Sequence, residues 1–393
     1  MAIYTHYIDN VSGATGNGGT GPNDAHYNFQ QAIDGISAGA YTLNDLAVIY
    51  VKGTGVTYEE EGVVNFPNVR LKFIGSNSSF EQDGTKPVIS NSTDYFMRDL
   101  TNFSNRIYFT NFEFRGGYSI FKQGGYWGMS RCDFYSEGGS YVMQGDEGGF
   151  KPSIPGTAVN CNFYDWNTIH YSGSNRSAWD FIYCYMKNSD PHRQGGSNGS
   201  KWLVNCILDN STVRRTRYAT YHIINCLFYN SEMQIGDRTT SDTAAVIVNN
   251  AFIDASGYAF TSLSVEDAET YLFDSNIFDG AVSGNFDMDN NFDPALYFGI
   301  TASSGNPTFV DEATGGTAGF QPTNSSTMSK ISMFNNDIGP IRSADPVAVE
   351  LSAATADFDS SLALNSTITF EGSGKRWKLT SKPKNGIPVF RRS

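Results

Sequence analysis

One short strand-like phrase recurs between Ile107 and Gly280, and it constrains the fold more than any other feature of the sequence. The phrase begins with two apolar residues and a polar residue, which is usually Asn. A Cys or other small or apolar residue follows, and then any residue and a large apolar residue. The phrase ends with any residue and one of Asn, Asp, Ser or Gly. The central four positions read Asn111-Phe112-Glu113-Phe114, Arg131-Cys132-Asp133-Phe134, Asn160-Cys161-Asn162-Phe163, Tyr183-Cys184-Tyr185-Met186, Asn205-Cys206-Ile207-Leu208, Asn225-Cys226-Leu227-Phe228, Asn249-Asn250-Ala251-Phe252 and Ser275-Asn276-Ile277-Phe278.

The spacing of this phrase predicts a solenoid. Successive fourth positions are 20 to 29 residues apart, as from Phe114 to Phe134 and from Phe134 to Phe163. Self-similarity at such a period marks units that bury their apolar face by stacking on one another. The unit alternates apolar and polar residues over a few positions, as a strand does. We therefore expect an all-β protein built on a right-handed parallel β-helix. An antiparallel β-sandwich is the alternative, although its strands have no reason to repeat one phrase.

The cysteines support stacked coils. All five, Cys132, Cys161, Cys184, Cys206 and Cys226, hold the same position of the phrase. Stacked strands lie about 4.8 Å apart, which predicts an internal ladder of small buried side chains. An odd number of thiols on one parallel ladder argues against a disulfide framework. The absence of a CxxC or His-Cys cluster from the sequence argues against zinc.

The sequence suggests three parts. Residues 1–46 would hold a strand, a Gly-rich loop and a capping helix, with Asp24 as N-cap, Phe29, Ala32, Ile33 and Ile36 on one face, and an end at Gly39. Residues 47–345 would form the β-helix. In 69–75, alternation predicts that Val69, Leu71 and Phe73 face inward and that Arg70 and Lys72 face outward. Residues 346–393 would form a small β module with strands near 347–351, 366–370 and 376–379.

The C-terminal residues and the rest of the chain carry net charges of opposite sign. Residues 371–393 carry seven basic residues and one acidic residue, a net of +6, and the remainder carries a net of −19. This split predicts a module that docks on an anionic partner or mediates oligomerisation. A solvated edge hairpin is the alternative. The candidate docking residues are Lys375, Arg376, Lys378, Arg391 and Arg392. No nucleic-acid motif is present, so we expect no nucleic-acid partner.

Several other classes of protein are not expected. No run approaches 18 apolar residues, so we expect no membrane insertion, and the start of the chain lacks the basic and apolar regions of a signal peptide, which suggests synthesis in a cytoplasm. The Gly-rich loop after Ile8 lacks the pattern of a phosphate-binding loop. Residues 285–293 alternate carboxylates but lack the Gly and Glu of an EF-hand, so a solvated turn is favoured over a calcium loop. We expect no cofactor and no metal.

The sequence resembles a known group of proteins. The resemblance rests on Tyr7-Ile8-Asp9-Asn10, Phe29-Gln30-Gln31-Ala32-Ile33, Val48-Ile49-Tyr50-Val51-Lys52-Gly53, the Asn-Cys-x-Phe phrases, Asn306-Pro307-Thr308-Phe309-Val310-Asp311 and Asp337-Ile338-Gly339. These resemble right-handed parallel β-helix proteins of the pectate-lyase-like superfamily, and among them phage tailspikes and other β-helical virion appendages. The resemblance covers residues 4–345. It implies the fold, whereas function differs between members because one scaffold carries many sites.

Candidate functional residues lie mainly in the middle coils. Hydrolysis would need two carboxylates facing one bond, and lyase chemistry would need a base with a cation. The candidates, none of which forms a recognisable motif, are Asp180, Asp190, His192, Arg193, Lys201, Arg214, Arg215, Arg217 and His222, with Asp146-Glu147 as a second group. Polar turns are the alternative interpretation. Aromatic residues that could stack on sugars, or pack between coils, are Tyr126, Trp127, Trp166, Trp179 and Trp202.

Three functional hypotheses follow. The favoured one is a structural or host-binding component of a phage virion, located on the particle as a spike, appendage or decoration, non-catalytic or glycan-binding. Such appendages follow the symmetry of their mounts, which predicts a homo-oligomer, with a trimer favoured. The alternatives are a polysaccharide depolymerase, either a lyase or a glycoside hydrolase, and a bacterial β-helix adhesin. The expected partners are other virion proteins, bound through the C-terminal module, and a host surface glycan.

Overall fold

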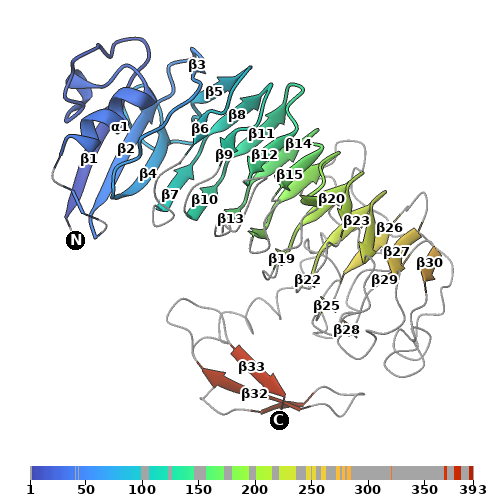
Figure 1. Ribbon diagram of the computed structural model, residues 1–393. Helices are drawn as coiled ribbons and strands as arrows, with labels where there is room; N and C mark the ends of the chain where they lie inside the picture. The colour runs from blue at the N-terminus through green and yellow to red at the C-terminus, as the bar shows by residue number, and fades with distance from the viewer. Residues whose placement is uncertain are drawn as a thin grey trace.

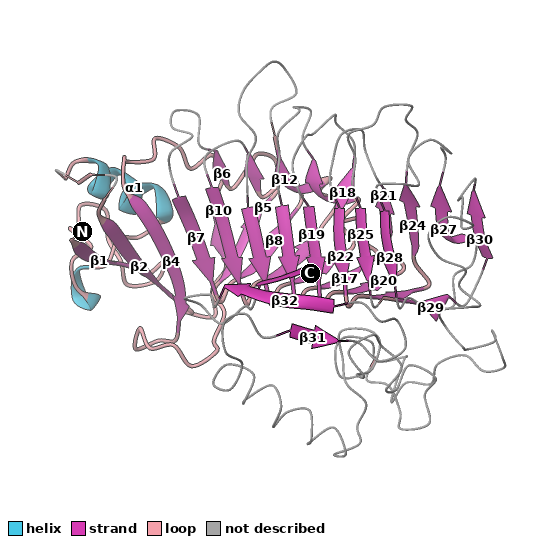
Figure 2. Cartoon of the chain, turned by 90° about the horizontal axis from the view of Figure 1, so that it is seen from below, coloured by secondary structure: helices cyan, strands magenta, loops and turns pink. Residues whose placement is uncertain are grey.

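The structure of the protein is a computed structural model. It describes residues 2–39, 41–42, 44–98, 106–122, 126–145, 156–171, 179–193, 201–214, 221–235, 245–248, 250–253, 258–262, 271–274, 277–278, 281–284, 320, 367–369, 376–381 and 389–392. The chain winds through stacked coils from the N-terminal end to β30, as Figure 1 shows. Figure 2 shows the strands of one sheet side by side along the axis of this solenoid.

Two long sheets run the length of the solenoid. Sheet A has 11 strands, and sheet B has 10. Sheet A consists of β1 Ile3–Ile8, β2 Leu46–Lys52, β4 Arg70–Ser76, β7 Arg106–Thr110, β10 Tyr126–Ser130, β13 Gly156–Val159, β16 Trp179–Ile182, β19 Lys201–Val204, β22 Tyr221–Ile224, β25 Ala245–Val248 and β28 Tyr271–Asp274. Sheet B consists of β3 Tyr58–Glu59, β5 Val88–Asn91, β8 Glu113–Gly116, β11 Asp133–Ser136, β14 Asn162–Tyr164, β17 Tyr185–Lys187, β20 Ile207–Asp209, β23 Leu227–Tyr229, β26 Ala251–Ile253 and β29 Ile277–Phe278.

Shorter sheets form the third side. Sheet C consists of β6 Met97–Arg98, β9 Phe121–Lys122, β12 Tyr141–Gln144, β15 Thr168–Tyr171 and β18 His192–Arg193. Sheet D consists of β21 Thr212–Arg214, β24 Glu232–Ile235, β27 Tyr258–Ser262 and β30 Ala281–Gly284. A separate sheet of three antiparallel strands lies near the C-terminus, and its strands are β31 Thr367–Thr369, β32 Arg376–Ser381 and β33 Val389–Arg392.

The strand register confirms the predicted fold class. Every pairing in sheets A to D joins parallel strands on successive coils, as in β11 with β14 and β13 with β16. The fourth residues of the repeated phrase pair directly with one another. The pairs run through Phe114, Phe134, Phe163, Met186, Leu208, Phe228, Phe252 and Phe278. Crossovers between parallel strands are right-handed, so the chain forms an all-β right-handed parallel β-helix with a small C-terminal β module.

The polar residue that opens each phrase turns the chain from sheet A to sheet B. It has a left-handed backbone, with φ of 67° at Asn111, 54° at Asn160 and 54° at Asn205. Asn tolerates this conformation better than other residues with a side chain, which explains its frequency here. At the next corner, Asn188 and Asn210 also have positive φ. Their amides stack, because Asn210 Nδ2 donates to Asn188 Oδ1 at 2.6 Å.

The predicted cysteine ladder is confirmed. Each Cys comes directly before a strand of sheet B, and those strands are mutually paired. All five thiols are free and buried. Cys206 Sγ lies 3.3 Å from the backbone oxygen of Phe181, on the preceding coil. Phe112 continues the column on the N-terminal side and Asn250 continues it on the other side, and both are fully buried. Burial raises the pKa of the Cys132, Cys161, Cys184 and Cys206 thiols.

Helix α1, Phe29–Ser37, covers the N-terminal end of the solenoid (Figure 1). The predicted inward face, Phe29, Ala32, Ile33 and Ile36, is fully buried. The predicted N-cap was wrong. Asn28 caps the helix by accepting a hydrogen bond from Gln31 N at 2.9 Å, while Asp24 ends a separate short 3-10 helix, Pro22–Asp24. Pro22 favours that earlier turn because its ring fixes φ. The helix ends at Ser37, two residues before Gly39.

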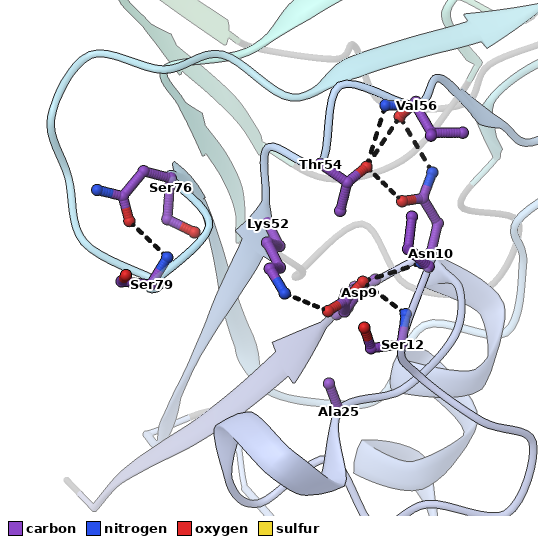
Figure 3. A network of polar contacts seen from close by, with 12 residues as sticks. Asp9, Asn10, Ser12, Ala25, Lys52, Thr54, Val56, Ser76 and Ser79 are labelled. Atoms are coloured by element: carbon purple, nitrogen blue, oxygen red, sulfur yellow. Dashed lines mark hydrogen bonds and ion pairs between the residues drawn. The ribbon is translucent and has the colours of Figure 1, made fainter.

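Figure 3 shows how the Gly-rich loop after β1 is held in place. Asp9 accepts hydrogen bonds from Val11 N and Ser12 N, both at 2.9 Å, and pairs with Lys52 Nζ at 2.7 Å. Asn10 accepts from Thr54 Oγ1 at 2.7 Å. These contacts tie the loop to the end of β2, which gives it a structural role.

The buried carboxyl group of Glu60 is expected to make the stability of the protein depend on pH. Its carboxyl is buried beneath α1 and accepts a hydrogen bond from Phe29 N at 3.1 Å. Burial raises its pKa to about 7, against the pull of that hydrogen bond. The folded state therefore binds a proton that the unfolded state releases near pH 4.5, so stability falls as pH rises from about 4.5 to 7. We expect Glu60→Gln to be more stable than the parent at pH 8 by up to ~3 kcal/mol.

Urea unfolding at pH 8 and pH 4 would measure this effect. The difference between Glu60→Gln and the parent should nearly vanish at pH 4, where both side chains are neutral. Glu59→Gln, an exposed neighbour on β3, is the matched control and should show no such change. An equal difference at both pH values would contradict the assignment.

A second apolar cluster lies outside the solenoid, on the outer face of sheet B. Tyr185, Ile207, Leu227 and Ala251 form one outward row along paired strands, and all four are buried. Phe320 is also buried in this cluster, and its ring lies 4.7 Å from that of Tyr229. A residue far along the sequence therefore covers this face of the middle coils.

The inward and outward positions predicted for 69–75 are confirmed at Val69, Leu71 and Phe73, which are fully buried, and at Arg70 and Lys72, which are half-buried. The predicted strand near 347–351, the carboxylate-rich 285–293 and the segments 306–311 and 337–339 of the resemblance lie outside the described residues.

Candidate functional site

An outward row of polar and aromatic residues crosses the middle strands of sheet A. Thr157 on β13 pairs with Asp180 on β16, which pairs with Trp202 on β19, which pairs with His222 on β22. Side chains alternate between the two faces of a strand. Their neighbours, such as Phe181 and Leu203, therefore point into the core, and these four point out. The row joins three residues that the sequence analysis selected separately.

Trp202 is the most accessible member of the row. Its side chain is 36% exposed, while Trp127, Trp166 and Trp179 are buried. The Trp202 and His222 rings stack face to face, with centroids 3.8 Å apart and planes within 6°. Burial lowers the pKa of His222, so its ring is neutral at neutral pH. Because this separation is shorter than the ~4.8 Å between strands, the indole leans toward His222 and away from Asp180.

Asp180 lies on the open side of the indole. It is half-buried, and burial raises the pKa of its carboxyl to about 6, although a hydrogen bond with the Trp202 backbone acts in the opposite direction. The carboxyl is therefore ionised at neutral pH and protonated in mild acid. Among the outward residues described on the sheet A strands β7, β10, β13, β16, β19 and β22, it is the sole carboxylate.

Thr157 and Tyr126 border the other side of Asp180. Tyr126 Oη donates a hydrogen bond to Thr157 Oγ1 at 2.7 Å, which fixes the phenol beside β13. Thr157 and Trp202 stand two strands apart, or roughly 9–10 Å at the usual strand spacing. Asp180 lies on the strand between them. We use the word slot for this part of the outer surface of sheet A, which carries Trp202, Asp180, Thr157 and Tyr126, and it is the candidate site.

A parallel outward row of aliphatic residues runs beside the slot. Val159, Ile182, Val204 and Ile224 pair along the same four strands, and each is half-buried. The surface therefore offers one aromatic wall, a carboxyl, hydroxyl groups and an apolar border. Sugars present the same combination, since a pyranose has an apolar face and a polar rim. Aromatic side chains with a polar partner suit such ligands.

Three of the predicted stacking residues have another role. Trp127, Trp166 and Trp179 pack inside the solenoid, where a sugar in solvent has no access. Trp166 Nε1 donates to the Phe134 backbone oxygen at 3.1 Å. The indole of Trp179 occupies the space that a side chain at position 156 would need, because a Cβ on Gly156 would lie 2.2 Å from its ring. Packing between coils, the alternative considered above, applies to these three.

The predicted catalytic group is not brought together as a whole. Asp180 lies on sheet A, whereas Asp190 precedes β18 in sheet C, where its Oδ1 accepts from Thr212 N at 2.8 Å and so holds the start of β21. His192 and Arg193 form β18, and Lys201 points into the core. Arg214 ends β21. Asp146, Glu147, Arg215 and Arg217 lie outside the described residues.

Sequence reasoning missed Thr157 and the order of the row. The signal was available in the phrases, since each member of the row lies four residues before a Cys or Asn of the ladder column: Thr157 before Cys161, Asp180 before Cys184, Trp202 before Cys206 and His222 before Cys226. In the part of the chain that the structure describes, no group of three or more His, Cys, Asp or Glu residues could hold a metal ion. The described residues also include no helix long and apolar enough to cross a membrane.

Comparisons with known proteins add little to this geometry. No family model matches the sequence, and no curated protein matches it. Among solved structures, the pectin methylesterase from Aspergillus niger in deglycosylated form is 11% identical, with 74% of this chain and 88% of that chain covered and a TM-score of 0.27. The same enzyme in penultimately deglycosylated form gives 12% identity, the same coverage and the same TM-score. Likeness at this level carries no argument, so the fold rests on the strand register.

Proposed function

We propose that the protein is a glycan-binding β-helix and that it recognises a polysaccharide through the slot on sheet A. The observation that carries this proposal concerns the two faces of the Trp202 indole. One face stacks on His222, which holds the ring in place, and the opposite face is open on the side of Asp180. A sugar ring in the slot would lie against the indole and exchange hydrogen bonds with Asp180 and Thr157. The groups sit on paired strands, so little conformational entropy is lost when a ligand binds.

Binding of capsular and lipopolysaccharide glycans from candidate hosts to the purified protein tests the proposal. We expect Trp202→Ala to weaken binding about tenfold, which corresponds to ~1.4 kcal/mol and is within the range of aromatic contacts. Tyr118→Ala removes another exposed aromatic residue, 40% exposed and just before β9, and should bind like the parent. Unchanged binding by Trp202→Ala would place the glycan elsewhere.

A polysaccharide depolymerase is the second candidate. It is favoured by one observation, that burial raises the pKa of the Asp180 carboxyl to about 6, into the range of a general acid. A hydrolase would need a second carboxylate facing the same bond, and the outward residues described on the sheet A strands from β7 to β22 supply Asp180 alone. Release of reducing ends or of an unsaturated uronate, lost in Asp180→Asn but retained in Glu59→Gln, would establish this activity. Binding without either product supports the binding function.

The resemblance to tailspikes and other virion appendages supports a location on a phage particle, with the C-terminal module as the attachment or trimerisation element. In this proposal the protein displays its sheet A slot to the host surface. Light scattering on the purified chain should then give the mass of a trimer. A monodisperse monomer at high concentration would count against the appendage assignment without affecting the glycan site.

A further inference from the structure

The outward row of sheet A continues on the N-terminal side of Thr157. Thr157 pairs with Gly128 on β10, and Gly128 pairs with Tyr108 on β7. Both residues hold outward positions of their strands, because their neighbours Met129 and Phe109 belong to the core. The row that contains Asp180 and Trp202 therefore reaches two strands beyond Thr157.

The ring of Tyr108 lies across Gly128. Gly128 is buried although it holds an outward position, and a Cβ there would lie 2.4 Å from Cδ1 and 2.9 Å from Cε1 of the Tyr108 ring. The φ of Gly128 is outside the left-handed region, so the backbone conformation does not require glycine. The missing side chain instead makes room for the phenol, which leans over the next strand toward Thr157.

Tyr126 lies beside Tyr108 on the same surface. The two ring centroids are 5.8 Å apart, with the planes tilted by 49°, and Tyr126 Oη is fixed by its hydrogen bond to Thr157 Oγ1. Both tyrosines are half-buried, so part of each side chain is exposed to solvent. Together they form an aromatic surface over β10, on the opposite side of Thr157 from Asp180.

Aromatic rings therefore border the polar part of the row at both ends. Thr157 and Asp180 lie between β10, which Tyr108 covers, and β19, which carries Trp202. These two strands are three strand spacings apart, or about 14 Å, and the indole of Trp202 leans further away toward His222. One pyranose ring is shorter than this distance, so a single sugar cannot contact both aromatic ends.

We propose that Tyr108, held over Gly128, forms a second sugar subsite, and that the slot binds a linear segment of at least two sugars. This inference rests on the proposed glycan-binding function. One sugar lies against Trp202 and another against Tyr108, because the apolar face of a pyranose suits an aromatic ring. The hydroxyl groups between them face Asp180 and Thr157. The bound segment crosses the strands and runs parallel to the axis of the solenoid.

Glycan fragments of different lengths test this inference. The probes are the capsular and lipopolysaccharide glycans named above, together with size-fractionated oligosaccharides cut from the glycan that the parent binds. The affinity of the parent should rise with fragment length until a fragment reaches both aromatic ends. Tyr108→Ala should bind the polysaccharide up to about tenfold more weakly than the parent. It should bind the shortest fragments like the parent, because these occupy the more exposed Trp202.

Three further variants separate a contact with the sugar from an effect on the fold. Tyr108→Phe keeps the ring and should retain most of the affinity. Gly128→Ala should displace the ring and weaken binding of the polysaccharide, and it should cause no further loss when combined with Tyr108→Ala. Tyr50→Ala removes another half-buried outward tyrosine of sheet A, on β2, and should bind like the parent.

The outcomes distinguish the second subsite from the glycan-binding function itself. If Trp202→Ala weakens binding while Tyr108→Ala binds the polysaccharide like the parent, the second subsite is wrong and the proposed function stands. An equal loss for short and long fragments in Tyr108→Ala would show that Tyr108 only supports the surrounding structure, and would overturn the subsite. Parent affinity that is independent of fragment length would overturn it as well. If the parent binds none of these glycans, both proposals fail.

Discussion

Phe109→Ala should destabilise the protein by about 3–5 kcal/mol, the range for removal of a large buried aromatic side chain. Phe109 is 1% exposed and lies where several rings meet. Its ring is stacked on Phe73 at 4.8 Å, and it contacts Phe121 at 5.3 Å and Phe114 at 5.5 Å. These rings come from sheets A, B and C, so the cavity would weaken all three sides of the coil at once.

Urea unfolding followed by circular dichroism measures this loss, and hydrogen exchange locates it. In a solenoid each coil contacts its neighbours only, so protection should fall most in β4, β7 and β10. Tyr27→Ala, which removes an aromatic side chain that is 46% exposed, should change stability by less than about 0.5 kcal/mol. A Phe109→Ala protein within 1 kcal/mol of the parent would mean that the surrounding rings close the cavity.

Asn250→Ala should cost about 2–5 kcal/mol through two lost hydrogen bonds. Asn250 is fully buried at the end of the cysteine column. Its Oδ1 accepts from Cys226 N at 2.8 Å, and its Nδ2 donates to the Ile223 backbone oxygen at 2.9 Å. Alanine would leave both backbone groups unpaired in the core, and each buried unsatisfied group costs ~1–3 kcal/mol.

Asn250→Cys provides the matched comparison for this position. It installs the residue that the five preceding coils carry, whose thiol can donate to a carbonyl as Cys226 Sγ does to Leu203 O at 3.3 Å. A thiol offers a poor acceptor to Cys226 N, so we expect about half the loss seen with alanine. Equal stability of the Asn250→Ala protein and the parent in urea unfolding would show that another group takes over both bonds.

The repeated phrase made most of the fold predictable. Its polar first residue needs a left-handed backbone, its second residue enters the core column, and its fourth residue faces the core from sheet B. These three requirements recur in each coil from β7 to β23, so they leave a mark at a constant spacing within the phrase. The register from Phe114 to Phe278 could therefore be predicted without any structural information.

The strands of sheets C and D and the roles of individual aromatic residues were not predictable in the same way. β9 and β18 have two residues each, too few to show alternation. Trp179 and Trp202 both follow polar loops, and a shift of one position decides which is buried and which is exposed. Asp180, Trp202 and His222 are 20 or more residues apart in sequence, so their contact depends on the register of sheet A.

The connection from sheet A to sheet B has two residues in each coil from β7 to β23, whereas the connection back to sheet A varies from three residues after β9 to eleven after β12. Axial length therefore depends on how many coils are stacked and is independent of how many residues each contains. Eleven strands of sheet A span about 48 Å at the usual spacing. Insertions in the connections that return to sheet A would widen the molecule at that edge and leave the axial distance between any two coils unchanged.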